Sequence, residues 1–339
     1  MRVLLLKTSS MGDIIHTLPA LTDAGNALQN IRFDWVVENS FAEIPPWHPL
    51  VDRVIPVALR RWRKGILSSD TRTGLRQLKK TFNEQHYDLI LDAQGLVKSA
   101  FLAFLAKGTR VGLDWGSARE SLASIAYQKK CTVNFYQHAI LRMRQLFSQA
   151  LNYKLPETAP VFGLTMPPPS SSLNEKYLVF LHGTTWDTKQ WPESYWMQLV
   201  DLAGASGYRV KIGGGNPIEV ERAERIARHN PIVDVMPYLD IKTMAGLLAN
   251  AKAAVAVDTG FGHLAAALDV PTVSIYGSTN PAYTGALGKT SIHLATQFAC
   301  SPCVSRTCTY KGSTLVTPGC YATVPPSMVW ERVRSIVTD

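Results

Sequence analysis

Short apolar runs alternate with longer amphipathic stretches along the whole chain. In the first half, strand character marks 2–7, 33–37, 54–57, 88–92 and 109–112, and helical spacing marks 13–28, 72–85, 95–107, 118–128 and 136–151. In the second half, strands are predicted at 177–182, 208–212, 232–235, 253–257 and 271–276, and helices at 192–206, 217–229, 241–250, 260–268 and 326–338. Such alternation is typical of parallel sheets with right-handed crossovers. We therefore predict an α/β protein with two Rossmann-like domains.

A proline- and serine-rich stretch interrupts this alternation near the middle of the chain. Residues 167–172 are three prolines followed by three serines, a composition that favours a linker. We predict an N-terminal domain at 1–165, a linker at 166–175, a C-terminal domain at 176–322 and a final helical segment at 323–339.

The overall composition is that of a folded globular protein. Of the 339 residues, 46% are hydrophobic and 18% are charged. The chain has no apolar run of about 18 residues, so we expect no membrane-spanning helix. The first residues lack the layout of a signal peptide, and we therefore expect a cytoplasmic protein.

Positive charge is concentrated in the first half. Residues 1–170 hold 21 Lys and Arg against 13 Asp and Glu, whereas 171–339 hold 14 against 13. The densest cluster is Arg60, Arg61, Arg63 and Lys64. Because no nucleic-acid motif accompanies this cluster, an anionic membrane or acceptor is the favoured partner, and a solvated helix face is the alternative.

The turn at residues 7–13 follows a buried strand and opens a helix. In an open α/β sheet, this is the edge at which ligands bind. The turn carries one acid, Asp13, and the hydroxyls of Thr8, Ser9 and Ser10. Asp13 is either a general base toward a substrate hydroxyl or only a helix N-cap.

Two turns in the second half have the same strand-to-helix position. One carries Thr184, Thr185 and Lys189, which together with free N–H groups at a helix start suit phosphate oxygens. The other runs from Asp258 through Thr259 and Gly260 to His263, within reach of an anion bound at the helix start. The alternatives are a plain βα turn with a surface lysine and a structural histidine.

Three glycines at 213–215 precede Glu219. They do not fit the Gly-x-Gly-x-x-Gly pattern, because position 218 is isoleucine. We interpret them as room for close backbone approach, with Glu219 either accepting two ribose hydroxyls or facing solvent at a helix start.

Some phosphate and metal motifs are absent from the sequence. No two of the fifteen aspartates are separated by a single residue, and no Walker sequence is present. We therefore expect a diphosphate to be neutralised by Lys189 and helix N-termini, with no metal ion required.

Four cysteines fall close together near the end of the chain. Their spacing is Cys-x2-Cys-x4-Cys-x11-Cys, from Cys300 through Cys303 and Cys308 to Cys320. They either bind zinc or remain free structural thiols, since disulfides are disfavoured in a reducing cytoplasm.

Taken together, these motifs resemble those of the bacterial ADP-heptose:lipopolysaccharide heptosyltransferases of glycosyltransferase family 9, most like heptosyltransferase I. The resemblance spans nearly the whole chain and is carried by 7–21, 33–38, 60–64, 92–98, Lys189 with Trp191 and Pro192, and Asp258 to His263. It implies a GT-B fold, with parallel sheets facing a central cleft and the final helix packing back on the N-terminal domain. It also implies a peripheral enzyme on the cytoplasmic face of the inner membrane.

The resemblance implies an inverting, metal-independent transfer of L-glycero-D-manno-heptose from ADP-heptose to Kdo of Kdo2-lipid A, with no nucleic-acid partner. Asp13 matches the general base. The implied donor contacts are Thr184, Thr185, Lys189, Glu219, Leu239, Asp258, Thr259, Gly260 and His263, and the implied acceptor contacts are Ser10, Arg60, Arg61, Arg63, Lys64 and Arg119. The alternatives are transfer to the first heptose, because segment 298–320 is more like heptosyltransferase II, and a non-catalytic nucleotide-sugar-binding protein.

Overall fold

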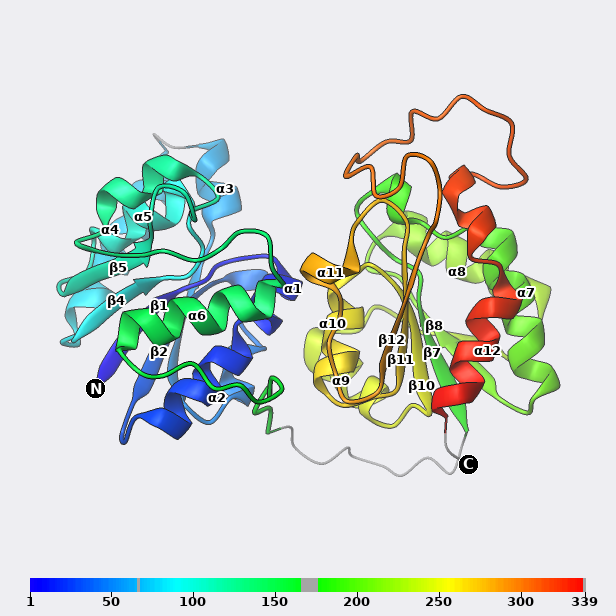
Figure 1. The fold of residues 1–339 in the computed structure, drawn as a ribbon, viewed down its shortest axis with the longest axis horizontal. Helices are drawn as coiled ribbons and strands as arrows, with labels where there is room; N and C mark the ends of the chain where they lie inside the picture. Colours follow the sequence, from blue (N-terminus) through cyan, green and yellow to red (C-terminus); the bar gives the residue numbers. More distant parts are fainter. Residues whose placement is uncertain (66–67, 166–175, 338–339) are drawn as a thin grey trace. The chain divides into compact units, whose positions relative to one another are not determined.

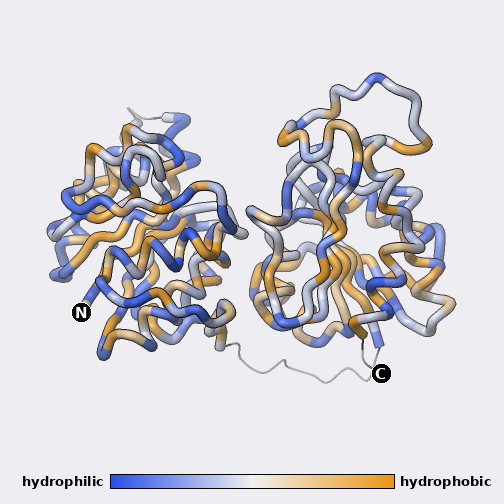
Figure 2. The backbone as a smooth tube through the Cα atoms, in the orientation of Figure 1, coloured by the Kyte–Doolittle hydropathy of each residue, from blue (hydrophilic) through white to orange (hydrophobic). Residues whose placement is uncertain are grey.

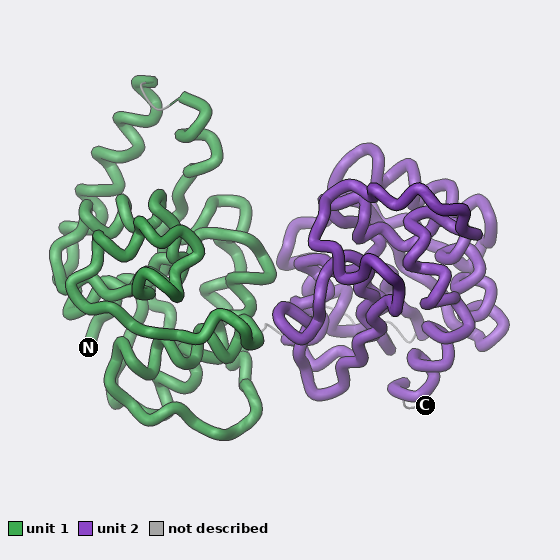
Figure 3. Tube along the Cα trace, turned by 45° about the horizontal axis from the view of Figure 1, so that its top comes forward, with its two compact units in different colours: residues 1–166 green, residues 167–339 purple. Residues whose placement is uncertain are grey.

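The computed structural model describes residues 1–65, 68–165 and 176–337. The chain divides into two compact units, residues 1–166 and 167–339 (Figure 3). The predicted linker at 166–175 lies outside the described residues. No helix in the described ranges combines the length and the apolar composition needed to cross a bilayer.

The first unit is a six-stranded parallel sheet with helices (Figure 1). Its strands are β1 (Arg2–Leu6), β2 (Arg32–Glu38), β3 (Val51–Val57), β4 (Leu89–Asp92), β5 (Thr109–Leu113) and β6 (Lys129–Cys131). Its α-helices are α1 (Met11–Ile15), α2 (Leu18–Ala27), α3 (Leu59–Lys64), α4 (Ser69–Asn83), α5 (Val97–Ala103) and α6 (Ala139–Leu151). Three 3₁₀ helices are η1 (Asn39–Phe41), η2 (Pro45–Trp47) and η3 (Ser121–Ala126).

The second unit repeats this architecture. Its strands are β7 (Tyr177–Leu181), β8 (Arg209–Ile212), β9 (Val233–Val235), β10 (Ala253–Val257), β11 (Thr272–Tyr276) and β12 (Ser291–Ala295). Its α-helices are α7 (Glu193–Ala205), α8 (Pro217–His229), α9 (Ile241–Ala249), α10 (Gly260–Ala267), α11 (Pro281–Thr284) and α12 (Pro326–Ile336), with 3₁₀ helices η4 (Asp187–Lys189) and η5 (Gly319–Thr323).

Both sheets have the same strand order. In the first unit the order is β3-β2-β1-β4-β5-β6. In the second unit it is β12-β11-β10-β7-β8-β9, which matches the first when it is read from β9 to β12. The order reverses between β1 and β4 and between β7 and β10, and such switch points are where open α/β sheets bind ligands. Leu6 pairs with Asp92 across the first switch point, and Leu181 pairs with Ala256 across the second. The loops that follow the two paired strands of each sheet therefore begin side by side at the same edge of that sheet.

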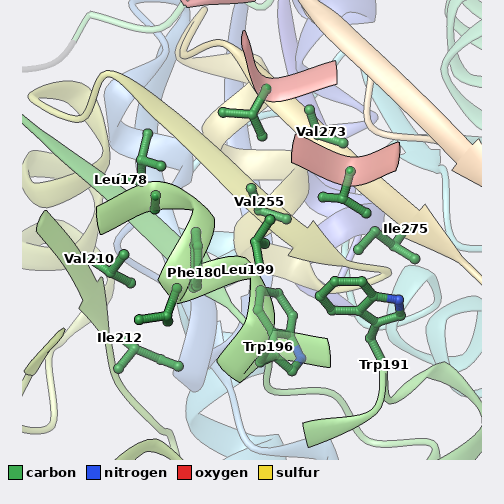
Figure 4. Close-up of a cluster of buried hydrophobic side chains, with 14 of the residues drawn as sticks. Leu178, Phe180, Trp191, Trp196, Leu199, Val210, Ile212, Val255, Val273 and Ile275 are labelled. Atoms are coloured by element: carbon green, nitrogen blue, oxygen red, sulfur yellow. The ribbon is translucent and has the colours of Figure 1, made fainter. Parts of the chain in front are cut away.

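The central strands of each sheet are buried, so they are almost continuously apolar. Figure 2 shows the hydrophobic residues concentrated in the strands in the interior of both units. In the second unit the core includes Trp191 and Trp196, whose rings meet edge to face with centroids 5.0 Å apart (Figure 4). The Trp191 Nε1–H donates to the carbonyl of Val324 at 3.0 Å, which ties the C-terminal segment to this core.

The final helix packs on the second unit. The apolar side of α12, with Val329, Trp330 and Val333, is buried in the core of the second unit, where α12 packs against α7, β10 and β11. That the final helix also packs back on the N-terminal domain stays a prediction. The helix follows Val324, whose carbonyl is held by Trp191, so its starting point is fixed on the second unit.

Several element boundaries also differ from the prediction. The helix expected at 13–28 is divided into α1 and α2, and Pro19 lies in the first turn of α2, where its missing N–H is tolerated. The stretch predicted as a helix at 118–128 contains a 3₁₀ helix instead. The sequence prediction also omitted β6, β12, α3 and α11, which are short and carry weak periodicity.

Candidate active site

The loop after β1 is fixed by the loop after β4, across the first switch point. The Oε1 atom of Gln94 accepts hydrogen bonds from the backbone N–H groups of Thr8, at 2.9 Å, and Ser9, at 3.2 Å. The Lys7 Nζ donates to the carbonyl of Ala93 at 3.0 Å. These contacts hold the backbone that leads into α1 and its acidic residue.

Asp13 lies in the first turn of α1, and its two carboxylate oxygens have different partners. Oδ2 accepts from the Ser10 N–H at 2.7 Å and the Ser10 hydroxyl at 3.0 Å. Ser10 is the N-cap of α1 and Asp13 is the third residue of the helix, so Asp13 closes a capping box and is not itself the N-cap. Oδ1 lies 3.9 Å from the Lys7 Nζ, and the Asp13 side chain is 39% exposed, whereas that of Lys7 is 7% exposed. The carboxylate is thus both anchored and open to a ligand.

Positive groups surround Asp13. Burial lowers the pKa of Lys7, the charges of Asp13 and Asp92 oppose that shift, and the charges of Arg142 and Arg119 add to it. Arg119, proposed from the sequence, and Arg142 therefore lie within electrostatic reach of Lys7. Burial also lowers the pKa of Arg142, against the charge of Asp13. The loop is consequently an anion-attracting site that contains one accessible carboxylate.

Arg142 is a candidate that sequence reasoning missed. It comes from α6, and its guanidinium lies 4.4 Å from the centroid of the Phe135 ring. Its Nη2 donates to the carbonyl of Ser117 at 3.2 Å, while its buried Nε has no hydrogen-bond acceptor among the described residues. Nothing in the periodicity of α6 separates Arg142 from other surface cations, so only the fold reveals it.

Two buried residues at the same switch point also had no predicted role. Lys7 and Gln94 each follow a strand that is buried throughout. The usable signal was that a polar side chain stands next to a wholly apolar strand, at the edge where ligands bind. Asp92 is buried as well; burial raises its pKa, although Tyr127 donates to its Oδ2 at 2.7 Å.

The basic cluster of residues 60–64 forms α3, which follows β3. Arg60, Arg61, Arg63 and Lys64 are exposed, and the Arg61 Nε lies 3.1 Å from Asp70 Oδ2. Because β3 lies two strands from β1, the ends of these strands are about 10 Å apart. The cluster therefore shares the ligand-binding edge with Asp13 but does not touch it directly.

In the second unit, Asp258 connects several of the predicted donor residues. Its Oδ2 lies 2.7 Å from the Lys189 Nζ and accepts from the Thr279 hydroxyl at 2.7 Å. Its Oδ1 lies 3.7 Å from the His263 Nε2, and its carbonyl accepts from the Thr184 hydroxyl at 3.2 Å. The loops after β7 and β10 are thus joined across the second switch point.

The Asp258 carboxylate is charged and inward-facing. Burial by itself would raise its pKa, but the hydrogen bond from His263 and the charge of Lys189 hold the pKa well below its ordinary value. The side chains of Lys189 and Asp258 are 16% and 8% exposed. The ammonium is therefore the more accessible member of the pair, next to Thr259 and Gly260 at the start of α10.

Glu219 lies over the loop after β7. Its Oε2 accepts from the Gly215 N–H at 2.8 Å. A Cβ atom added to Gly183 would lie 2.7 Å from the Glu219 carboxyl carbon, so a glycine is needed for this approach. The structure brings Glu219 against Gly183, the residue before Thr184. Thr185 is exposed, and Leu239 is half-buried in the segment between β9 and α9.

The cysteine-bearing segment supports the loop that carries Lys189. The buried Thr188 donates its hydroxyl to Ser278 Oγ at 3.0 Å and also contacts the carbonyl of Ser305, and Tyr321 donates to the Thr188 carbonyl at 3.1 Å. The four cysteines Cys300, Cys303, Cys308 and Cys320 are free thiols that line one pocket together with Thr188. Among the described residues, no group of three or more His, Cys, Asp and Glu side chains could hold a metal ion.

The sequence matches a known protein family over most of its length. Residues 75–314 match glycosyltransferase family 9 (heptosyltransferase). The chain is 53% identical to lipopolysaccharide heptosyltransferase 1 of Pseudomonas aeruginosa over 92% of this chain and 88% of that protein. It is 48% identical to lipopolysaccharide heptosyltransferase 1 of Escherichia coli K12 over 85% of this chain and 92% of that protein.

The fold is also similar to a solved heptosyltransferase structure. The Escherichia coli heptosyltransferase WaaC with ADP-2-deoxy-2-fluoro heptose superposes with a TM-score of 0.83, at 41% identity, covering 99% of both chains. The predicted GT-B architecture, with two Rossmann-like domains, is thereby confirmed.

Proposed function

The chain belongs to glycosyltransferase family 9, the heptosyltransferases, and we propose that it moves L-glycero-D-manno-heptose from ADP-heptose to Kdo of Kdo2-lipid A. The observation that supports this most is the accessible Asp13 carboxylate at the first switch point, 3.9 Å from the buried Lys7. Four relatives named heptosyltransferase 1 are 46–53% identical and a fifth is 27% identical, whereas three relatives named heptosyltransferase 2 are 24–25% identical, and this difference favours Kdo over the first heptose as the acceptor.

In this proposal, Asp13 is the general base of an inverting transfer. A carboxylate oxygen accepts the proton of the acceptor hydroxyl as the new bond to the anomeric carbon of heptose forms and the bond to the ADP oxygen breaks. The Ser10 N–H and hydroxyl keep Asp13 in place, and the Lys7 Nζ lies 3.9 Å from its other carboxylate oxygen. ADP leaves as an anion from the face opposite the attack, which inverts the configuration.

The donor is held by the second unit. We assign the diphosphate to Lys189, Thr184, Thr185 and the first N–H groups of α10 at Thr259 and Gly260, with His263 beside them. These groups supply positive charge where charge develops on the leaving group, so the proposed reaction requires no metal ion. Glu219 accepts the ribose hydroxyls and Leu239 borders adenine. Asp258 acts as a positioning residue, since its carboxylate is directed at Lys189 and Thr279.

The acceptor is held by the first unit. Arg119 and Arg142 lie near Asp13 and suit the carboxylate of Kdo, for which the unpartnered Arg142 Nε supplies a donor. The exposed cations of α3 suit the phosphates that lie farther along Kdo2-lipid A. With a lipid-anchored acceptor, we place the enzyme peripherally on the cytoplasmic face of the inner membrane.

The test is release of ADP from ADP-heptose with Kdo2-lipid A as acceptor, in the presence of EDTA. We expect turnover by wild type and a loss of at least ~100-fold for Asp13→Asn, which keeps the size of the side chain but removes the base. Binding of ADP should be unchanged in this variant. Asp70→Asn is the matched control, because Asp70 is also an acid in the first turn of a helix, and it should remain active.

Each other outcome contradicts a defined part of the proposal. Wild-type turnover by Asp13→Asn would remove the base assignment. Activity with a heptosylated core but not with Kdo2-lipid A would assign heptosyltransferase II-like transfer. Activity only without EDTA would establish a metal requirement, and ADP-heptose binding with no turnover on either acceptor would indicate a non-catalytic binding protein.

A further inference from the structure

Large apolar side chains are exposed mainly in one part of the first unit. Seventeen large hydrophobic side chains are exposed in the described part of the chain, and eight of them fall within residues 97–136. Five of the eight belong to two short helices: Val97, Phe101 and Phe104 on or directly after α5, and Leu122 and Ile125 on η3. We call these five residues the apolar face.

The apolar face is continuous because the two helices pack through their small residues. Ala100 of α5 and Ala123 and Ala126 of η3 are buried together with Tyr127 in one cluster. Residues 97, 101 and 104 lie on one side of an α-helix, and residues 122 and 125, three apart, lie on one side of a 3₁₀ helix. Ala100 lies at the edge of that side of α5, next to η3, and the larger residues of both helices remain exposed, with fractions from 47% for Val97 to 69% for Ile125.

Cations accompany the apolar face. Residues 97–136 contain six Lys and Arg against two Asp and Glu, a formal net charge of +4. Both acids have internal partners: Asp114 accepts from the Ser117 N–H at 2.9 Å, and Glu120 accepts from the Val97 N–H at 2.7 Å. The Arg110 guanidinium lies 4.7 Å from the centroid of the Phe104 ring, which places a positive charge directly on the apolar face.

We propose that the apolar face docks onto an anionic phospholipid bilayer. Apolar and aromatic side chains accompanied by Lys and Arg are the composition of segments that lie at the boundary between headgroups and acyl chains. The net charge of this segment matches an anionic lipid surface, and the apolar side chains supply contacts that a soluble anion does not need. Helices α5 and η3 have seven and six residues, which suits shallow insertion rather than spanning.

The position of the apolar face connects docking to the acceptor site. Helix α5 (labelled in Figure 1) follows the loop in which Gln94 holds Thr8 and Ser9. The Glu120 N–H, next to η3, donates to the Gly95 carbonyl of that same loop at 3.1 Å. Docking would thus bring the loop that leads to Asp13 to the membrane surface. This part of the inference rests on the proposed function, because it requires an acceptor that is anchored in lipid.

The test is co-sedimentation with large vesicles of phosphatidylcholine and phosphatidylglycerol (7:3), compared with phosphatidylcholine alone, without any substrate. We expect wild type to bind the anionic vesicles and Leu122→Ser/Ile125→Ser to lose at least ~10-fold in partitioning, since each removes exposed apolar surface that insertion would bury. Val161→Ser/Leu315→Ser is the matched control, because Val161 and Leu315 are also exposed, at 59% and 95%. Neither double variant should lower the melting temperature.

The outcomes separate this inference from the proposed function. Equal vesicle binding by wild type and Leu122→Ser/Ile125→Ser would overturn the docking surface, whatever the activity. A wild-type dimer that this variant converts to a monomer, without a change in vesicle binding, would assign the apolar face to a second copy of the chain and also overturn it. Vesicle binding that needs the apolar face in a protein without transferase activity would support the surface and refute only the function.

Discussion

The ion pair between Lys189 and Asp258 offers a test of the second unit in which stability and ligand binding separate. Replacing Lys189 with methionine keeps the length and most of the volume of the side chain, but it removes the ammonium. Asp258 then stays buried without the charge that lies 2.7 Å from its Oδ2. We expect Lys189→Met to lose both stability and affinity for ADP, for two different reasons.

The loss of stability can be worked from the geometry. Two unit charges about 4 Å apart near a protein surface interact by about 4 kcal/mol, and breaking one partner of a buried pair costs about 3–5 kcal/mol. The hydroxyl of Thr279 and the ring of His263 remain to stabilise Asp258, so we expect the lower end, about 3 kcal/mol. For a domain of this size, the melting temperature should fall by about 6–12 °C.

A second substitution distinguishes the two effects. Lys189→Met/Asp258→Asn removes the stranded carboxylate, so it should recover at least half of the lost stability. Affinity for ADP should remain about 10- to 100-fold below wild type in both variants, because the cation that we assign to the diphosphate is missing. Calorimetry with and without ADP measures both quantities, since ADP raises only the melting temperature of the unit that binds it.

An exposed pair in the same unit provides the control. Lys289 and Asp269 are also 2.8 Å apart, but their side chains are 81% and 46% exposed, so Lys289→Met should cost less than about 1 kcal/mol. Our reasoning would be refuted if Lys189→Met were as stable as Lys289→Met. It would also be refuted if the double variant bound ADP as tightly as wild type.

Two further predictions concern the same unit. Gly183→Ala places a Cβ atom 2.7 Å from the carboxyl carbon of Glu219 and should displace that flexible side chain, so we expect a Kd for ADP about fivefold higher at an unchanged melting temperature; an unchanged Kd would remove Glu219 from the ribose site. Burial lowers the pKa of His182 to about 4. Below about pH 6.5 the unfolded chain therefore binds a proton at His182 that the folded chain does not bind. Because protonation then favours the unfolded chain, the free energy of unfolding should fall by about 2 kcal/mol between pH 7 and pH 5. In urea titrations His182→Gln should show a smaller loss, and an equal loss in both proteins would contradict this assignment.

The sequence predicted both sheets because their strands are buried on both faces. Leu4 to Leu6 and Ala253 to Val257 are apolar runs followed directly by polar turns. This change from apolar to polar residues can be recognised in the sequence alone. The strands β6 and β12 lack this change from apolar to polar residues. Lys129 and Lys130 are exposed and β12 is mostly half-buried, so these edge strands have little apolar signal.

The candidate site was predictable where its residues follow strands next to the switch points. Asp13, Lys189 and Asp258 belong to such loops, and the structure adds their ion pairs, Asp13 with Lys7 and Lys189 with Asp258, while their roles stay predictions. Arg142 was not predictable, because it comes within electrostatic reach of Asp13 from a helix far along the chain. The packing of α12 in the core of the second unit was not predictable either, since its apolar side gave no indication of which of the two sheets it would cover.

The two units use the same pairing of lysine and aspartate in opposite ways. In the first unit the lysine is buried and the carboxylate is accessible, with exposed fractions of 7% for Lys7 and 39% for Asp13. In the second unit the carboxylate is the more buried partner, at 8% for Asp258 against 16% for Lys189. The accessible member decides what each switch point can do. An accessible carboxylate can accept a proton from a hydroxyl, whereas a more accessible ammonium paired with a buried carboxylate can attract an anion. A transfer that removes a proton from one substrate and stabilises a departing diphosphate on the other needs one site of each kind.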